Sequence, residues 1–506
     1  MIRRPEVRTP DPWRDADIVV GVGSRFGVTV PELRSLLDLA LDRAGLAAAE
    51  VTALATVKEK ATEQALVALA AELSLPIRAY TGAELAQISV QRPSLRVQAA
   101  TGTPSVAEAA ALLGANRGVR PSPYRVDTAV ELLVGKVSSA RATVAVARRT
   151  TVNLLHHGDA ELEAGLLDLA VNVSAEPRPD WLDAAILAAC TQLSAYPNPA
   201  AASTAVAARH CRSADEVLLT AGAAEAFTLI AHGIASRIPG TSGPLAVVVH
   251  PQFTEPEVAL RTANWQIERL TLSSTDGFVL DPDRVPDNAD LVVIGNPTNP
   301  TGTQHTADVI RSLIRPGRVV LVDEAFMDSV PGEPESVGND ADLTGLLVTR
   351  SLTKTWGLAG LRIGYLLGDR DLIRRLARVQ PHWSVSSPAL AAAVACMSEE
   401  AQVVTGIRAT ALVRQRSELR DALYDRGFEV PDISHGPFLL TRHRDRPSLH
   451  SELRQARIAV RRADTFPGLG PGWVRIAVRD ETATQTLLAA IDATAATSND
   501  ESESGA

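Results

Sequence analysis

Short apolar runs alternate with amphipathic stretches through the first part of the chain. The runs are typical of buried strands, and the first stretch repeats its apolar residues at helical spacing, at Leu33, Leu36, Leu37 and Leu41. This alternation predicts a small α/β domain over residues 1–150. Its expected elements are a strand over 17–23, a helix opened by Thr29 and Pro31, a strand over 51–56, a helix over 65–73 and a strand over 77–80.

In the second part, over residues 151–495, runs that are apolar after their first residue end in polar residues. The run 290–295 leads into a double-proline loop that holds Asn299, and the run 318–322 ends at Asp323. Open α/β sheets bind ligands at the carboxyl ends of their strands, and a buried charge such as that of Asp323 is costly unless it is paired. The pattern therefore predicts a ligand site where these strands end.

Lys354 follows a third apolar run, 346–349, and it is the only lysine after Lys136. The other basic residues of this part are arginines, whose guanidinium stays protonated and cannot form a Schiff base. Lysine can, once burial or nearby charge lowers its pKa. If this part of the chain carries out imine chemistry, Lys354 is the residue that does so. The alternative is an incidental lysine in a polar turn after a buried strand.

Composition and charge narrow the class of protein. A chain of 506 residues is longer than one hydrophobic core usually organises. A net charge of -9 argues against a nucleic acid or an anionic membrane as partner. Cys190, Cys211 and Cys396 share no metal-ligand spacing, so we expect no metal site and three small buried side chains. Residues 1–13 lack an apolar signal core and no apolar run is long enough to span a membrane, which predicts the cytoplasm. The polar segment 496–506 predicts a disordered acidic tail.

The segment Ser351-Leu-Thr-Lys354, followed by Gly360-Leu-Arg-Ile-Gly364, resembles the lysine segment of fold-type I pyridoxal phosphate (PLP) enzymes of the aminotransferase class I/II group. The resemblance covers nearly all of 151–490 and implies a mostly parallel large-domain sheet with a smaller α+β domain. It also implies that Lys354 holds PLP as an imine, is displaced by the substrate amine and then moves protons. Asp323 would keep the pyridine nitrogen protonated, which makes the ring an electron sink.

Other residues are expected around the cofactor. A helix beginning near Ala223 and Ala224 would offer backbone N–H groups and small side chains to a phosphate, and Phe253, just past a strand end, can cover one face of a flat ring. Taken alone, these are an ordinary strand–helix turn and a core aromatic. The resemblance implies PLP contacts from Asn299 to the ring oxygen, from Ser351, Thr353 and Arg362 to the phosphate, and from Tyr196 to the phosphate of a neighbouring subunit. It therefore implies a homodimer with shared active sites.

Phe326 stands where histidinol-phosphate aminotransferases of this group usually place a tyrosine that contacts the ring oxygen. At this residue and in the segments 350–354, 381–385, 466–469 and 473–479, the chain resembles the L-threonine-O-3-phosphate decarboxylases of cobalamin synthesis.

The same resemblance implies a set of substrate contacts. Arg475 would clamp the α-carboxylate, Arg461 would be a second cationic anchor, Asn172 would help to hold the substrate, and His157 and Gly158 would contact its phosphate. The sequence His157-Gly-Asp159 is shorter than the His-Gly-Gly-Asn of the family, and recognition of a substrate phosphate depends on this segment.

The first domain carries a second resemblance, over residues 21–27, 54–60, 103–112, 132–136 and 142–147. These segments are similar to the C-terminal domain of cobalt-precorrin-5A hydrolases and its relatives in cobalamin biosynthesis. Ser24 departs from the cysteine often found in that family, and no reaction follows from these residues. Lys58, Lys60 and Lys136 lie in this domain, either as an anionic-ligand site or as solvated surface charges.

Both halves of the chain therefore indicate cobalamin biosynthesis. The expected activity is decarboxylation of a phosphorylated amino acid, L-threonine O-3-phosphate, to (R)-1-aminopropan-2-ol phosphate. A histidinol-phosphate-type aminotransferase is one alternative, and a non-catalytic scaffold of the corrin pathway is another. The choice between decarboxylation and amino transfer depends on which α-carbon bond stands perpendicular to the cofactor plane. Differences of an ångström or less in the position of the substrate decide that orientation.

Overall fold

The computed structural model describes residues 16–44, 46–88, 90, 98, 103–116, 124–235, 243–431, 434–446, 448–470 and 472–503. The chain divides into two compact units, Met1–Asn153 and Leu154–Ala506. This division lies three residues beyond the boundary expected from the sequence. Each unit has its own sheets and its own hydrophobic core, so each is described separately.

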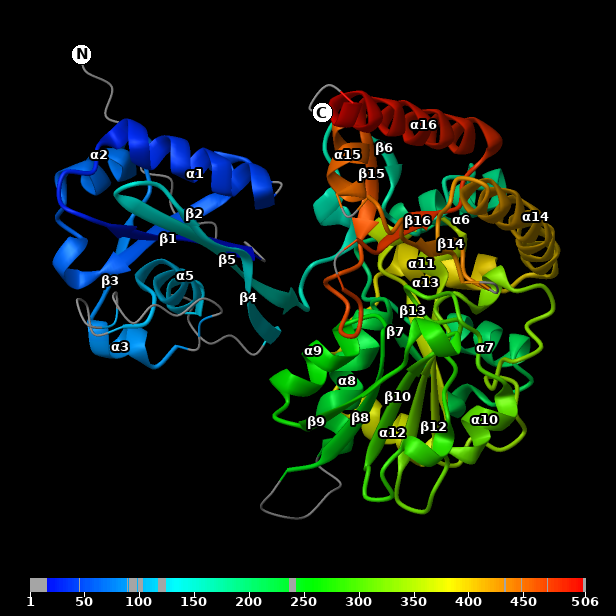
Figure 1. The fold of residues 1–506 in the computed structure, drawn as a ribbon. Helices are drawn as coiled ribbons and strands as arrows, with labels where there is room; N and C mark the ends of the chain where they lie inside the picture. The colour runs from blue at the N-terminus through cyan, green and yellow to red at the C-terminus, as the bar shows by residue number, and fades with distance from the viewer. Residues whose placement is uncertain are drawn as a thin grey trace. The chain divides into compact units, whose positions relative to one another are not determined.

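The first unit is built on a five-stranded sheet with the order β3-β2-β1-β5-β4. Strands β1, β2 and β3 are parallel, whereas β5 runs antiparallel to β1 and β4. Helices α1 and α2 cover one face and α3 and α5 the other, as Figure 1 shows. The elements are β1 Ala16–Ser24, α1 Val30–Ala44, β2 Val51–Val57, α2 Gln64–Glu72, β3 Ile77–Tyr80, α3 Gly82–Ala86, α5 Val106–Asn116, β4 Arg125–Ser138 and β5 Ala142–Asn153.

The larger sheet of the second unit has seven strands in the order β7-β13-β12-β11-β10-β8-β9. All of them are parallel except β13, so the mostly parallel sheet expected from the sequence is confirmed. The strands are β7 Val217–Thr220, β8 Leu245–His250, β9 Gln266–Thr271, β10 Leu291–Gly295, β11 Val319–Asp323, β12 Leu346–Ser351 and β13 Gly364–Gly368.

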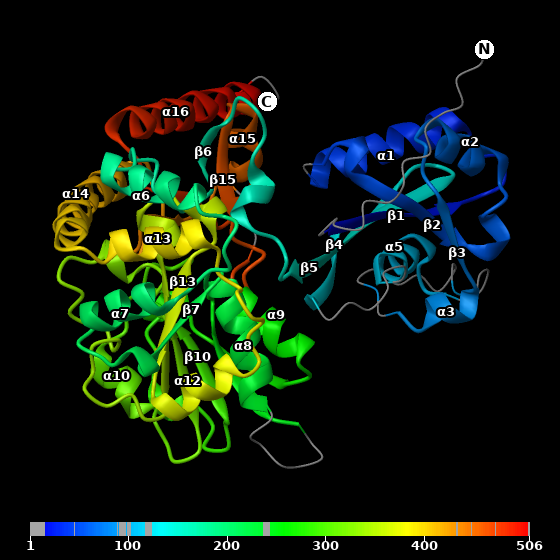
Figure 2. The same ribbon diagram turned by 180° about the vertical axis from the view of Figure 1, so that it is seen from behind.

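Helices cover both faces of this sheet, which explains why its central strands are apolar up to the polar residues at their carboxyl ends. In β11, Val320 and Val322 pack in the core on the side of α6, α7, α10 and α13, and Val319 and Leu321 pack toward α8, α9 and α12 (Figure 2). The helices are α6 Asp180–Cys190, α7 Ala200–Arg209, α8 Ala223–Ala235, α9 Glu255–Thr262, α10 Ala307–Ser312, α11 Leu352–Thr355, α12 Arg370–Ala377 and α13 Ser387–Cys396.

A smaller sheet in the order β14-β16-β15-β6 completes the second unit and is packed against α14, α15 and α16. Its short strand β6 pairs with β15, which lies almost three hundred residues later, so residues 158–172 are held against the carboxyl-terminal strands. The elements are β6 Leu167–Leu169, α14 Glu399–Tyr424, β14 Phe438–Thr441, α15 Leu449–Gln455, β15 Ile458–Arg462, β16 Val474–Ala477 and α16 Glu481–Glu503.

The carboxyl-terminal tail and two of the three cysteines differ from what the sequence predicts. Helix α16 continues to Glu503, so 496–503 is helical where the sequence predicts disorder, because the apolar face that buries Leu487 and Ile491 starts a helix that the polar tail extends. Residues 504–506 lie outside the described part. Cys190 and Cys211 are exposed, because both sit at the solvent-facing ends of helices, and only Cys396 is buried.

Among the described residues, no single helix combines the length and apolar character needed to cross a membrane. Helices α13 and α14, bent by 73° at their junction, meet that criterion only as a pair and only by length and composition.

Candidate active site

Asp323 lies at the carboxyl end of β11 and is buried. Its Oδ1 accepts hydrogen bonds from Thr349 Oγ1 at 2.9 Å and from the Ala325 backbone N–H at 3.2 Å, whereas no described residue donates to Oδ2. Burial raises the pKa of this carboxyl group, and the two hydrogen bonds and the charge of Lys354 oppose the rise. Asp323 therefore has one oxygen fixed and one oxygen free to accept from a cationic ring N–H.

Lys354 lies on the short helix α11, directly after β12, and is half-buried. Its Nζ is 5.9 Å from the centre of the Phe326 ring. Burial, together with the charges of Arg475 and Arg362, lowers the pKa of the Lys354 amine to about 8 against the opposing charge of Asp323. Near neutral pH a far larger fraction of this amine than of an ordinary lysine is therefore neutral and nucleophilic, as imine chemistry requires.

The amino end of α8 meets Arg362. A Cβ atom on Gly222, whose φ is +78°, would lie 2.5 Å from Arg362 Nη2, so glycine is needed to let the guanidinium approach the loop before the helix. Ala223 and Ala224 form the first turn of α8, and the hydroxyls of Ser351 and Thr353 lie 2.7 Å apart after β12. Arg362 forms no ion pair with a described carboxylate. A helix amino end and an uncompensated guanidinium together suit a phosphate.

Phe253 and His157 lie beside one another, with ring centres 5.5 Å apart. Phe253 follows β8, and His157 Nε2 lies 2.6 Å from Glu255 Oε1 at the start of α9. The structure thus brings the segment before η3 (Gly158–Glu161) to the same edge of the sheet as Phe253.

Arg475, on β16, is 4% exposed and lies beside three of the predicted site residues. Its Nη1 donates to Asn299 Oδ1 at 2.5 Å. With the Asn172 amide turned so that its oxygen faces the guanidinium, Asn172 Oδ1 accepts from Nη1 at 2.9 Å and from Nε at 3.2 Å. A Cβ atom on Gly158 would lie 3.4 Å from Arg475 Nη2, so a larger residue there would crowd the guanidinium.

The charge of Arg475 has no carboxylate partner within the described part of the chain. Burial lowers the pKa of Arg475 well below its usual value, and the neighbouring guanidinium groups of Arg461 and Arg479 lower it further. Because arginine keeps its proton at accessible pH, this shift expresses the cost of a buried, uncompensated cation. A carboxylate bound here would relieve that cost.

Arg461 pairs with Arg475 across the small sheet, but its guanidinium is occupied. Its Nη2 donates at 2.6 Å to the His156 carbonyl and to Thr465 Oγ1, and its Nη1 lies 3.7 Å from Glu161 Oε1. Arg461 therefore holds the η3 segment in place instead of presenting a free cation. The sequence did not predict this role of Arg461, because the residues that its guanidinium contacts come from other segments of the chain.

Tyr196 is the one predicted site residue that the structure does not bring to this region within a single chain. Its side chain is 76% exposed and stacks on Trp383, with ring centres 4.3 Å apart and planes 23° apart.

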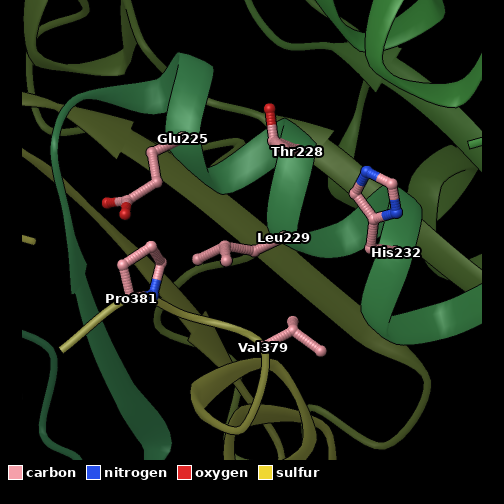
Figure 3. A pocket seen from close by; sticks show the side chains of 6 residues that line it. All are labelled: Glu225, Thr228, Leu229, His232, Val379 and Pro381. Atoms are coloured by element: carbon pink, nitrogen blue, oxygen red, sulfur yellow. The ribbon is translucent and has the colours of Figure 1, made fainter. Parts of the chain in front are cut away.

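A separate groove of about 380 Å³ lies between α8 and the segment that follows α12. It is lined by residues of α8, Glu225, Thr228, Leu229 and His232, and by Val379 and Pro381 (Figure 3). None of the residues predicted from the sequence to bind cofactor or substrate lines this groove.

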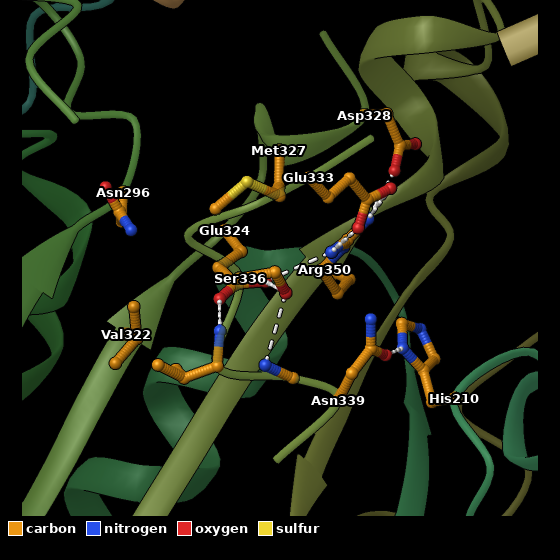
Figure 4. Close-up of polar contacts among 12 residues, drawn as sticks. His210, Asn296, Val322, Glu324, Met327, Asp328, Glu333, Ser336, Asn339 and Arg350 are labelled. Carbon is orange, nitrogen blue, oxygen red and sulfur yellow. Dashed lines mark hydrogen bonds and ion pairs between the residues drawn. The ribbon is translucent and has the colours of Figure 1, made fainter. Parts of the chain in front are cut away.

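A buried ionic network extends from the residue after Asp323 (Figure 4). Arg350 Nη1 lies 3.0 Å from Glu324 Oε2 and 2.9 Å from Glu333 Oε2, and its Nη2 binds Asp328. Burial raises the pKa values of Glu324 and Asp328, whereas the charge of Arg350 holds that of Glu333 at about 2. The network fixes the loop after β11 against β12, and so it positions Asp323.

Sequence reasoning missed three other residues of the site. Thr349 holds Asp323, Phe438 packs against Arg475 with 5.4 Å between Cζ and the ring centre, and Asp159 lies close enough to Lys354 for its charge to oppose the fall in the lysine pKa. A signal for Thr349 is present in the sequence, because a polar residue interrupts an apolar strand just before Lys354. The contact of Phe438 depends on packing between distant segments and has no such signal.

Comparison with known proteins agrees with this geometry. Residues 164–491 match the family described as Aminotransferase class I and II, and residues 18–147 match the family described as Cobalamin synthesis G C-terminus. A histidinol-phosphate aminotransferase of Mycobacterium tuberculosis is 44% identical over 329 residues, which cover 64% of this chain and 87% of the relative. The threonine-phosphate decarboxylase of Salmonella typhimurium is 29% identical over 345 residues, covering 64% and 90%.

The fold is shared with solved structures. The histidinol-phosphate aminotransferase of Clostridium acetobutylicum superimposes with a TM-score of 0.59 and 21% identity, over 65% of this chain and 98% of that one. The predicted PLP dependence is confirmed by these relatives, because aminotransferases of classes I and II are PLP enzymes. The first unit matches the cobalamin-synthesis family. The strand order, the geometry of the site and these matches together show that the chain belongs to the aminotransferase class I and II family.

Proposed function

We propose that this protein decarboxylates L-threonine O-3-phosphate, releasing CO2 and (R)-1-aminopropan-2-ol phosphate. The observation that favours a decarboxylase over an aminotransferase is the cobalamin-synthesis match of the first unit. A cobalamin-synthesis unit on the same chain favours the relatives that are decarboxylases of cobalamin synthesis. Retention of Lys354, Asp323 and Arg362 around one site speaks against a non-catalytic scaffold.

The residues present fit PLP. Lys354 would bond to the aldehyde carbon, Asp323 Oδ2 would accept from the ring nitrogen, Asn299 would donate its amide N–H to the ring oxygen, and Phe253 would cover one ring face. The phosphate would lie among the N–H groups of Ala223 and Ala224, the hydroxyls of Ser351 and Thr353, and the Arg362 guanidinium. When bound, PLP supplies the electron sink that stabilises negative charge at the substrate α-carbon.

The substrate is held by residues of the chain itself. Arg475 binds the α-carboxylate, and Asn172 and Asn299 fix the plane of its guanidinium. His157 and Gly158 contact the substrate phosphate, and Arg461 positions the segment that carries them. The neutral amine of Lys354 accepts a proton on substrate entry and returns one to the α-carbon after the carboxylate has left.

A histidinol-phosphate-type aminotransferase is the second candidate. It is favoured by the 44% identity to a relative of that name, against 29% for the decarboxylase. The two activities differ in their need for an amino acceptor.

The test is turnover of L-threonine O-3-phosphate by the full chain with PLP, with and without 2-oxoglutarate. A decarboxylase completes many turnovers per active site without acceptor. An aminotransferase stops after one equivalent and resumes only when 2-oxoglutarate is added, and that result would overturn the proposal.

We further propose a homodimer in which Tyr196 reaches the cofactor phosphate of the other subunit. Its support is the exposure of two large aromatic side chains, Tyr196 at 76% and Trp383 at 58%, which stack on each other at the surface. Leu187 and Leu193, also exposed, lie on the same part of the chain, at and after α6. Exposed aromatic and aliphatic residues of this kind are typical of subunit interfaces.

A further inference from the structure

We propose that Phe326 and Phe438 form an apolar wall that directs the reaction toward loss of the carboxylate. This inference rests on the proposed decarboxylation and assigns its reaction specificity to two residues. The apolar wall means these two side chains throughout.

Phe326 places the first ring of the wall beside the reactive amine. It follows Asp323 by three residues, and its ring centre is 5.9 Å from Lys354 Nζ. Ser329 Oγ donates to the Phe326 carbonyl at 2.6 Å and to the His435 carbonyl at 3.1 Å, so the loop that carries this ring is tied to the segment before β14. Phe326 is therefore fixed relative to Lys354.

Phe438 extends the wall from Phe326 to Arg475. The two rings meet edge to face, with centres 5.2 Å apart and planes 85° apart, and Arg475 Cζ lies 5.4 Å from the centre of Phe438. Phe438 is fully buried. A Cβ atom on residue 436 would lie 2.6 Å from Phe438 Cζ, so Gly436 is what allows the ring to occupy this place. The wall thus runs from the amine of Lys354 to the guanidinium of Arg475.

The apolar wall affects the reaction because phenyl rings offer no hydrogen bonds to a charged group. A carboxylate bound by Arg475 lies against ring surface that offers no hydrogen bond and excludes water, so its charge is poorly solvated on that side. When the bond between the α-carbon and the carboxylate carbon breaks, its electron pair stays on the α-carbon side, neutral CO2 leaves, and the α-carbon takes up one proton. Decarboxylation thus removes the poorly solvated charge, whereas amino transfer keeps the carboxylate ionised throughout, so the wall favours the former.

The first test replaces each ring separately, with Phe326→Ala and Phe438→Ala, and uses Phe428→Ala as the matched control. Phe428 is a buried phenylalanine in the core of the small sheet. Full-length variants are given L-threonine O-3-phosphate and 2-oxoglutarate, and the ratio of CO2 released to glutamate formed is measured. Because space for ordered water opens beside Arg475, the ratio should fall about tenfold in both wall variants and stay unchanged in the control.

The second test needs no turnover. Calorimetry on the full-length chain without PLP compares binding of L-threonine O-3-phosphate with binding of (R)-1-aminopropan-2-ol phosphate, which lacks the carboxylate. Loss of either ring should strengthen binding of the carboxylate ligand roughly 3- to 10-fold relative to the other ligand.

The two readouts separate failure of the wall from failure of the proposed function. An unchanged ratio of affinities in the wall variants would overturn the role of the wall, even if the wild type releases CO2. If the wild type releases no CO2, the decarboxylase proposal fails on its own. Either wall variant alone gives the calorimetric answer, so unfolding of one does not prevent the test.

Discussion

Thr349 Oγ1 donates a 2.9 Å hydrogen bond to Asp323 Oδ1 between residues that are paired in register on the parallel strands β12 and β11. Both residues are buried at the carboxyl end of the sheet. The hydrogen bond stabilises the ionised carboxylate and opposes the rise in pKa that burial causes. The strand register therefore controls the charge of the residue proposed to meet the cofactor ring.

Replacing Thr349 by valine should weaken cofactor binding. Loss of the hydrogen bond raises the Asp323 pKa further, so more of the carboxyl group is protonated and cannot accept from the ring nitrogen. A lost hydrogen bond of about 1 kcal/mol predicts an affinity for PLP roughly 5-fold weaker, measured by absorbance titration. Thr344→Val, at an exposed position, is the control. Equal affinities for PLP in the two variants would show that Thr349 does not tune Asp323.

The reactivity of Lys354 should depend on pH with a midpoint near 8 in the cofactor-free protein. The amine is neutral above its pKa of about 8, which lies below the ordinary lysine value of 10.5, so acylation of this residue should rise through pH 8. Between pH 8 and 10.5 the unfolded chain binds this proton more tightly, so the contribution of Lys354 to the free energy of unfolding rises with pH in that window. Peptide mapping by mass spectrometry gives the profile, and a midpoint near 10.5 would contradict the structure.

Arg475→Lys should reduce kcat/KM for the phosphorylated amino acid by about 10- to 150-fold. A lysine keeps the charge but loses the planar pair of donors, and a hydrogen bond to a charged group is worth roughly 1.5–3 kcal/mol. Arg414→Lys, on the exposed face of α14, is the matched control. Steady-state kinetics check the prediction. A loss no larger than that of the control would remove Arg475 from the substrate site.

Hybrid dimers test whether Tyr196 acts across subunits. Tyr196→Ala and Lys354→Ala homodimers should each have low activity. A heterodimer of the two has one site with Lys354 from one chain and an intact Tyr196 from the other, so activity should reappear at one site per dimer. Purification with two different tags and a standard assay give the result. Activity no higher than that of the Tyr196→Ala homodimer would show that the sites are not shared.

The strands and the residues at their ends were predictable, because the apolar runs of a parallel sheet covered on both faces are continuous in the sequence. Strand β3 has the predicted bounds, and β10 and β11 differ from the prediction by one residue at the start. The convergence of Asp323 and Lys354 followed from the rule that parallel strands present their carboxyl ends at one edge.

Long-range packing accounts for what was not predicted. The guanidinium of Arg461 contacts a carbonyl, a hydroxyl and Glu161 from other segments. The sequence around an arginine does not reveal such contacts, so it does not show whether the guanidinium is free to bind a ligand. The antiparallel direction of β13 depends on the turn after Lys354, where Arg362 has a φ of +58°. The stack of Tyr196 on Trp383 joins residues almost two hundred positions apart.

The most direct test of the proposed decarboxylation follows the substrate carboxyl carbon. L-Threonine O-3-phosphate labelled with ¹³C in the carboxyl group is incubated with the full chain and PLP in the absence of any keto acid, and the released gas and the products are analysed by mass spectrometry. The account predicts labelled CO2 in a one-to-one ratio with 1-aminopropan-2-ol phosphate, and no release by the Lys354→Ala variant. Retention of the label in a keto acid, with no CO2 released, would contradict it.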